Sequence, residues 1–241
     1  MRSLSLFLLI ILLFACTKKS ETIPINKAVG ITLSAPPIHI GDSVRYLALG
    51  DSYTYGSGVN QTESYPYQLA AQLRHGNYAV PDPAVTAFQG WTAADLLTGI
   101  ADGKITKKFD FVTLLIGVND QYRGTDLTTY TSQLDQLITA ATGYANGYSS
   151  RVFVISIPDW SVTPFAADMD RNKIKADVAL FNSINEAESK KFGAKYLDIS
   201  AIAELAANDP TLTASDGLHP SAKMYTLWVN QFYGGIVASF K

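Results

Sequence analysis

The 241-residue sequence predicts an α/β domain built on a parallel sheet that helices cover on both faces. Two observations support this fold class. Short apolar runs typical of strands recur along the chain, and segments with the apolar spacing of helices lie between them. Strands that alternate with helices favour a parallel sheet, because the crossover helices pack on its two faces. The sequence indicates no internal repeat and no second domain.

The first expected strand, residues 44–49, reads Val-Arg-Tyr-Leu-Ala-Leu and is apolar enough to be buried on at least one face. Similar runs follow at residues 85–88, 109–116, 151–157 and 195–199. Helical spacing of apolar residues is found at 65–74, 92–100, 127–141 and 173–192, and a last helix is expected over 222–240. In such sheets ligands bind beyond the carboxyl ends of the strands, so a site is expected in the loops there.

The N-terminus has the features of a secretory signal. A positive start is followed by an apolar run over residues 4–15, about a dozen residues, whereas a membrane-spanning helix needs about 20. Residues 13–16, Leu-Phe-Ala-Cys, resemble the lipobox of bacterial lipoproteins, in which the signal is cut before a cysteine that is then lipidated. Cys16 is the only cysteine, so it has no disulfide partner within the chain.

We therefore expect residues 1–15 to be a lipoprotein signal peptide and residues 16–42 to be a lipidated N-terminus and tether. Pro24, Pro36 and Pro37 break any helical pattern in that tether. The protein would then be extracytoplasmic and held at a bacterial membrane by a lipid on Cys16. An ordinary signal peptide with an incidental cysteine is the alternative.

Composition argues against several other functions. The formal net charge is -2, so no basic excess suggests a nucleic-acid partner. Three histidines and one cysteine leave little room for a zinc site, and neither a metal nor a cofactor is expected. His39 in the tether and His75 at a helix end are expected to be structural.

Ser52 is the candidate nucleophile, because Gly50-Asp51-Ser52 directly follows the first strand. Taken alone this tripeptide is a weak motif, and many junctions between a strand and a loop look similar. The segment does not read Gly-x-Ser-x-Gly, since Thr54 stands where the second glycine would be. No Gly-Lys-Ser/Thr follows the glycines either, which argues against a phosphate-binding loop.

His219 is the candidate base for Ser52, because imidazole accepts protons near neutral pH. Asp216 precedes it by three residues, so in a turn its carboxylate can reach the far ring nitrogen and fix the tautomer. The structural alternative is a helix start, with Asp216 or Ser221 capping the last helix and Pro220 in its first turn. Both interpretations can hold together.

Ester hydrolysis passes through an intermediate whose oxygen gains negative charge, so fixed hydrogen-bond donors are needed. The backbone N–H of Ser52, the N–H of Gly90 and the side-chain amide of Asn119 are the candidates for this oxyanion hole, and each follows a strand-like run. Gly90 and Asn119 could instead be plain turn residues.

Together these motifs resemble the SGNH (GDSL-type) hydrolase family from about residue 44 to the C-terminus. Its four lettered residues match Ser52 in Gly-Asp-Ser, Gly90, Asn119 in Gly-x-Asn-Asp, and His219 in Asp-x-x-His, with Asp216 as the orienting acid. The resemblance implies a three-layer α/β/α, flavodoxin-like fold with a parallel sheet of about five strands over residues 43–241. Asp51 and Asp120 also match family positions and are expected to support the loops.

The expected function is a serine esterase that forms an acyl-enzyme on Ser52 and acts on carboxylic esters, including acyl groups on carbohydrate or lipid. Thioester cleavage and acyl transfer could use the same residues. A catalytically silent lipoprotein that binds a glycan or lipid is the main alternative, and a structural envelope protein is a third. Trp160 and Phe165 could line the pocket or pack a loop, and the oligomeric state is left open.

Overall fold

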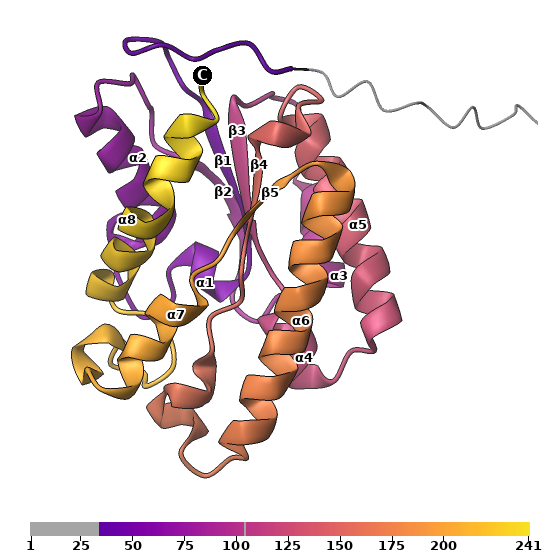
Figure 1. Ribbon diagram of the computed structural model, residues 1–241, viewed down its shortest axis with the longest axis vertical. Helices are drawn as coiled ribbons and strands as arrows, with labels where there is room; N and C mark the ends of the chain where they lie inside the picture. The colour runs from indigo at the N-terminus through magenta and orange to yellow at the C-terminus, as the bar shows by residue number, and fades with distance from the viewer. Residues whose placement is uncertain (1–33, 104) are drawn as a thin grey trace, which may run out of the picture. The chain divides into compact units, whose positions relative to one another are not determined.

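The computed structural model describes residues 34–103 and 105–241, and these form a five-stranded parallel sheet in the order β2-β1-β3-β4-β5. The predicted α/β fold with a parallel sheet is confirmed (Figure 1). The central strands are buried along their whole length, whereas both edge strands are partly exposed. The strands are β1 (Tyr46–Gly50), β2 (Ala84–Ala87), β3 (Phe111–Leu115), β4 (Val152–Ile155) and β5 (Lys195–Leu197).

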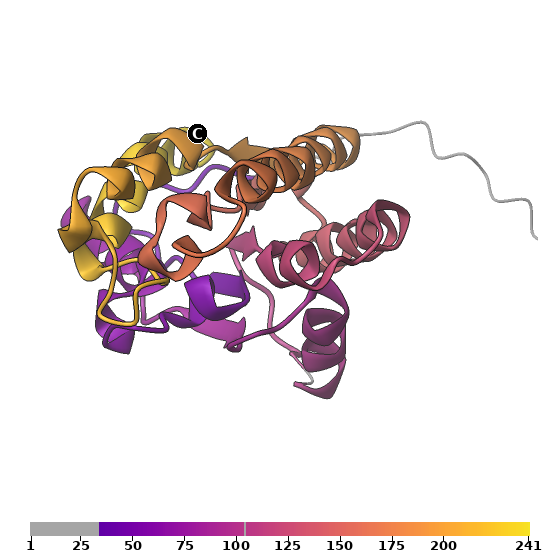
Figure 2. The same ribbon diagram turned by 90° about the horizontal axis from the view of Figure 1, so that it is seen from below.

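Five longer helices cover the sheet in two layers, which confirms the three-layer arrangement. Figures 1 and 2 show α2 (Tyr65–His75) and α8 (Ala222–Ala238) side by side on one face. The other face is covered by α3 (Ala93–Asp102), α5 (Leu127–Tyr144) and α6 (Arg171–Phe192). All five coincide with the segments predicted from apolar spacing, with ends that differ by a few residues.

Two short helices start within two or three residues of the carboxyl ends of β1 and β3, and the sequence pattern does not reveal them. They are α1 (Ser52–Tyr55), after β1, and α4 (Val118–Arg123), after β3. Each has fewer than two turns, so it cannot show a full apolar repeat. A third short helix, α7 (Ser200–Ala203), follows β5. Single turns of 3-10 helix lie at Gln61–Glu63, Ser149–Arg151, Trp160–Val162, Pro164–Ala166, Glu204–Ala207 and Pro210–Leu212.

The end of the expected tether already contacts the domain. Ile38 N–H donates to the carbonyl of Phe240 over 2.6 Å, and the Arg151 guanidinium donates to the carbonyl of Pro36 over 2.6 Å. The signal peptide and Cys16 lie outside the described residues. Within the described ranges, no helix has both the length and the apolar character that crossing a membrane requires.

Candidate active site

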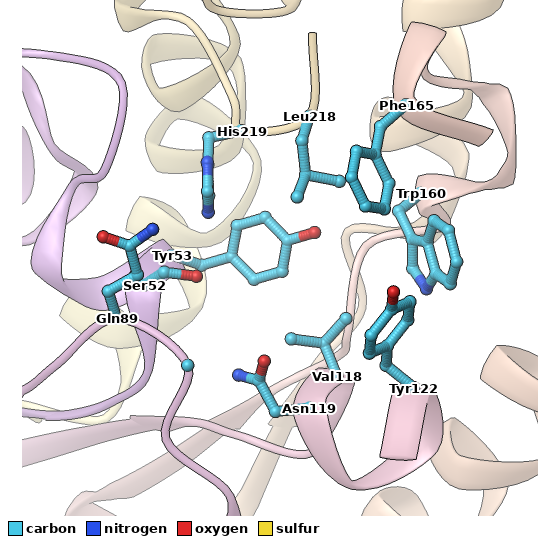
Figure 3. Close-up of a pocket in the computed structure, with 11 residues that line it drawn as sticks. Ser52, Tyr53, Gln89, Val118, Asn119, Tyr122, Trp160, Phe165, Leu218 and His219 are labelled. Carbon is cyan, nitrogen blue, oxygen red and sulfur yellow. The ribbon is translucent and has the colours of Figure 1, made fainter. Parts of the chain in front are cut away.

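The candidate site lies at the carboxyl ends of β1, β2 and β3. From β1 the chain moves to β2 on one side and later to β3 on the other, so the loops after β1 diverge from those after its neighbours. A reversal of this kind leaves a crevice where ligands bind in open α/β sheets. A pocket of about 180 Å³ lies there, lined by Ser52, Tyr53, Gln89, Gly90, Val118, Asn119, Tyr122, Trp160, Phe165, Leu218 and His219 (Figure 3).

Ser52 is the first residue of α1, directly after the strand that positions it. Asp51 caps this helix, because its Oδ1 accepts a hydrogen bond from the N–H of Tyr53 over 2.9 Å. Gly56 ends the helix in the left-handed region with φ of 90°, and a Cβ there would lie 2.6 Å from the Cβ of Ser64. The tight turn therefore holds the Ser52 side chain at the edge of the sheet.

His219 and Asp216 form a pair within one turn before α8. Asp216 Oδ2 lies 2.6 Å from His219 Nδ1, and its Oδ1 accepts hydrogen bonds from the N–H groups of Leu218 and His219, both over 2.9 Å. Burial alone would raise the pKa of the Asp216 carboxyl, but these donors together hold its pKa below the ordinary value. The cap of α8 is Ser221, whose Oγ accepts from the N–H of Met224. Asp216 therefore contacts the imidazole and does not cap the helix.

The structure brings Ser52 and His219 to the same pocket. Figure 3 shows the far nitrogen of the His219 ring pointing into the pocket on the side where Ser52 lies. The Tyr53 ring packs edge-on against the imidazole with centroids 5.7 Å apart. Among the described residues no hydrogen bond joins the Ser52 hydroxyl to His219, a bond that in many active sites tightens only when substrate binds.

The three candidate oxyanion donors line the same pocket. Gly90 has φ of 78°, a conformation that favours glycine. Among the described residues the backbone N–H groups of Ser52 and Gly90 donate to no other group. Asn119 donates one amide proton from Nδ2 to the carbonyl of Trp91 over 2.9 Å, so its second proton is left for a ligand.

Asp51 and Asp120 are buried carboxyls beneath the pocket. Burial raises the pKa of Asp51 to about 8, against the hydrogen bond from Tyr53, and the nearby Asp120 adds to the rise. Burial likewise raises the pKa of Asp120, whose Oδ2 accepts from the N–H of Ala93 over 2.9 Å. Both residues support loops, as expected. Each also has one buried oxygen without a partner among the described residues.

Three aromatic residues form one wall of the pocket, opposite Ser52 in Figure 3. Tyr122, Trp160 and Phe165 contact one another, with ring centroids 5.8 to 6.4 Å apart. Trp160 is nearly buried and its indole N–H donates to Gln121 Oε1 over 2.9 Å. Phe165 and Tyr122 are about half exposed. Lining and packing are therefore both roles of Trp160 and Phe165.

Some features of the site were not predicted from the sequence. Gln89, Val118 and Leu218 also line the pocket, although no motif singled them out.

The other two histidines lie away from the pocket. His39 pairs with Asp42 at the surface, and His75 ends α2. Over the part of the chain that the structure describes, no group of three His, Cys, Asp or Glu side chains could hold a metal ion.

The three-layer fold is shared with solved structures, among them two esterases. The chain is similar to TesA, with a TM-score of 0.64 and 15% identity over 81% of this chain and 99% of that chain. It is similar to Axe2, an acetylxylan esterase from Geobacillus stearothermophilus, with a TM-score of 0.64 and 17% identity over 83% of this chain and 96% of that chain. It is also similar to the psychrotrophic esterase EstA from Pseudoalteromonas sp., with a TM-score of 0.63 and 18% identity over 81% of this chain and 96% of that chain.

At these identities the likeness shows the fold. No curated protein matches the chain. The family follows from a sequence profile instead. The profile of the GDSL-like lipase/acylhydrolase family matches residues 48–227, and the chain belongs to this family. Membership gives the protein its general class, a hydrolase of carboxylic esters.

Proposed function

We propose that the protein is a serine esterase in which Ser52 is the nucleophile, His219 the general base and Asp216 the orienting acid. The observation that supports this most directly is the shared pocket, which Ser52 and His219 both line while Asp216 Oδ2 lies 2.6 Å from the other nitrogen of the imidazole. A carboxylate at Nδ1 fixes the tautomer that leaves Nε2 free to accept a proton, and it stabilises the imidazolium.

In the first half of the reaction His219 accepts the Ser52 proton while Oγ forms a bond to the ester carbonyl carbon. The negative oxygen of this tetrahedral intermediate accepts hydrogen bonds from the N–H groups of Ser52 and Gly90 and from the Asn119 amide. The C–O bond to the alcohol then breaks, and the alcohol leaves with the proton from His219. In the second half His219 takes a proton from water while the water oxygen forms a bond to the acyl carbon. The bond from that carbon to Ser52 Oγ then breaks, the acid leaves, and His219 returns the proton to Oγ.

The proposed substrates are carboxylic esters with a compact acyl group, carried by a carbohydrate or a lipid. The small pocket supports a compact group, because its volume of about 180 Å³ is bounded by the aromatic wall. The exposed faces of Tyr122 and Phe165 offer a surface on which the alcohol part could rest. A solved structure of similar fold is described as an acetylxylan esterase, which agrees with this choice.

The test is hydrolysis of p-nitrophenyl esters from acetate to long acyl chains by wild-type protein and Ser52→Ala. The matched control is Ser57→Ala, just after α1, whose hydroxyl is buried without a hydrogen-bond partner among the described residues. We expect Ser52→Ala to lose at least about 10³-fold in kcat, whereas Ser57→Ala keeps it.

A fluorophosphonate should label wild-type protein and Ser57→Ala but not Ser52→Ala. EstA provides a precedent, since its structure was solved inhibited by monoethylphosphonate. If wild type and Ser52→Ala are equally inactive and neither is labelled, the serine esterase is disproved. The chain is then better explained as a lipoprotein that binds a glycan or lipid without turnover.

For location we propose an extracytoplasmic protein anchored to a bacterial membrane through lipid on Cys16. The support is the sequence of residues 13–16, Leu-Phe-Ala-Cys, after an apolar run. Cells that produce the full chain should incorporate labelled palmitate into it, and Cys16→Ser should not incorporate the label. Equal labelling of the two proteins would reject the anchor.

A further inference from the structure

Three side chains of α4 hold the loop that carries Gly90. Arg123 Nη2 donates to the carbonyl of Gly90 over 2.7 Å, and Asn119 Nδ2 donates to the carbonyl of Trp91 over 2.9 Å. Asp120 Oδ2 accepts from the N–H of Ala93 over 2.9 Å. The loop after β2 is therefore tied along its length to the helix that follows β3. Of these three, only Asn119 and Asp120 match family positions in the sequence.

The Arg123 guanidinium is fixed from two sides. It is the last residue of α4, which Gly124 ends in the left-handed conformation, and its Nη1 lies 3.6 Å from Asp95 Oδ2. The same Asp95 oxygen accepts hydrogen bonds from the N–H and the hydroxyl of Thr92, the cap of α3. A planar guanidinium suits this place, because it can direct one N–H to the Gly90 carbonyl and another toward the carboxylate.

Gly90 depends on such external contacts, since it has no side chain to fix its conformation. A Cβ built on Gly90 would lie within 4 Å of one heavy atom, Nη2 of Arg123, which is 3.6 Å away. In the proposed function the N–H of Gly90 stabilises the oxyanion, and that effect requires the donor to be aimed before the reaction begins. The N–H of Gly90 belongs to the peptide group that precedes its Cα. The carbonyl that Arg123 holds belongs to the peptide group that follows it.

We propose that Arg123 is a positioning residue for the oxyanion hole, acting through its hydrogen bond to the Gly90 carbonyl. This inference rests on the proposed function of Ser52 and Gly90. Without the guanidinium, Gly90 samples orientations in which its N–H points away from the oxyanion. The transition state then loses stabilisation that the bound substrate does not need, so kcat falls while KM changes little.

The experiment compares Arg123→Gln and Arg123→Lys with a matched control, Arg74→Gln. Arg74 makes the same kind of contacts just before β2, at the other end of the strand that the Gly90 loop follows, with Nη1 2.9 Å from the carbonyl of Val80 and 3.5 Å from Asp82 Oδ1. Both arginine side chains are about half exposed. The readouts are kcat and KM on p-nitrophenyl acetate, the rate of fluorophosphonate labelling, and the melting temperature of each full chain.

We expect Arg123→Gln to lose about 10-fold or more in kcat and in labelling rate, less than the roughly 10²–10³-fold loss that removal of a donor causes. KM and melting temperature should match those of Arg74→Gln, and Arg123→Lys should recover part of kcat by donating one hydrogen bond. Wild-type kcat in Arg123→Gln, or an equal loss in Arg74→Gln, overturns the positioning role. If Ser52→Ala keeps full activity, the proposed function itself fails and this inference fails with it.

Discussion

The Asp51 carboxyl stabilises α1 through one oxygen, while burial of its other oxygen disfavours the ionised form. Its Oδ1 caps the helix through Tyr53, while its Oδ2 is buried and has no partner among the described residues. Burial, reinforced by Asp120, raises the pKa of Asp51 from 3.8 to about 8. The carboxyl beside the proposed nucleophile is therefore neutral at neutral pH, and ionising it costs free energy in the folded state.

This cost predicts how stability depends on pH. Between about pH 4 and pH 8 the folded protein keeps the Asp51 proton that the unfolded chain has released, so the folded state binds more protons and loses stability as pH rises. In Asp51→Asn the amide oxygen can still accept from Tyr53, but nothing titrates. The free energy of unfolding of wild type should fall relative to Asp51→Asn by up to about 1.4 kcal/mol per pH unit.

Urea unfolding of both proteins at pH 5, 6.5 and 8 measures this difference. The control is Asp126→Asn, which changes the exposed cap of α5, where Thr129 donates to Oδ1. Hydrogen bonds from Thr129 hold the pKa of Asp126 below its ordinary value, so it stays ionised from pH 5 to 8 and its substitution should shift stability equally at each pH. A constant difference between wild type and Asp51→Asn would contradict the burial of an uncharged Asp51.

At the scale of elements, apolar runs predict every strand and apolar spacing predicts each longer helix to within a few residues, because the interior strands are buried throughout and each of these helices buries one face. The short helices α1 and α4 escape this method, and they are the elements that carry Ser52 and Asn119. The residues proposed for the site are predictable from short motifs, three of which follow strand ends while the fourth, with Asp216 and His219, precedes α8. The residues that hold these site residues in place are harder to predict. The contact between Arg123 and Gly90, for example, joins positions 33 apart and leaves no local pattern.

The junction between α1 and α8 gives a prediction for these elements. The Tyr225 hydroxyl, fully buried on α8, donates to the carbonyl of Tyr53 in α1 over 2.9 Å. In Tyr225→Phe that carbonyl loses its donor inside the protein, which costs about 1–3 kcal/mol. We expect the melting temperature to fall by roughly 2–4 °C per kcal/mol lost and kcat to fall as α1 loosens.

Calorimetry and ester hydrolysis on one preparation check both effects. The matched control is Tyr233→Phe on the same helix, whose hydroxyl makes no hydrogen bond among the described residues. That variant should match wild type in both measurements. If Tyr225→Phe also matches wild type, this hydrogen bond does not hold α1.

At the scale of the whole molecule, the packed domain extends upstream of the first strand. Arg151 is 2% exposed and lies over the Phe240 ring with its Cζ 5.2 Å from the centroid. Its Nη2 donates to the carbonyl of Pro36, while its Nε and Nη1 have no partner among the described residues. Burial lowers the pKa of Arg151, which reflects the cost of holding a cation there. The segment around Pro36 therefore compensates a buried charge.

A chain that begins at residue 43 should consequently be less stable than one that begins at residue 34. Loss of the Pro36 carbonyl leaves the guanidinium without its acceptor, and we expect the free energy of unfolding to fall by about 2 kcal/mol or more. Urea unfolding of the two chains measures the loss, and Arg151→Met in both provides a double-mutant cycle. With Met at position 151 the free energies of unfolding of the two chains should differ by less. If the difference is as large as with Arg151, the buried charge is not the cause of the lost stability.

The contact between Tyr53 and Tyr225 joins positions 172 apart, so the beginning and the end of the domain meet beneath the pocket. Contacts of such long separation are disfavoured until much of the chain is already ordered. Recovery of activity after dilution from denaturant should therefore lag behind formation of the sheet. A protein in which α8 has not yet packed onto the sheet would therefore be inert, and the pocket would become competent for catalysis only when the two ends of the domain have met.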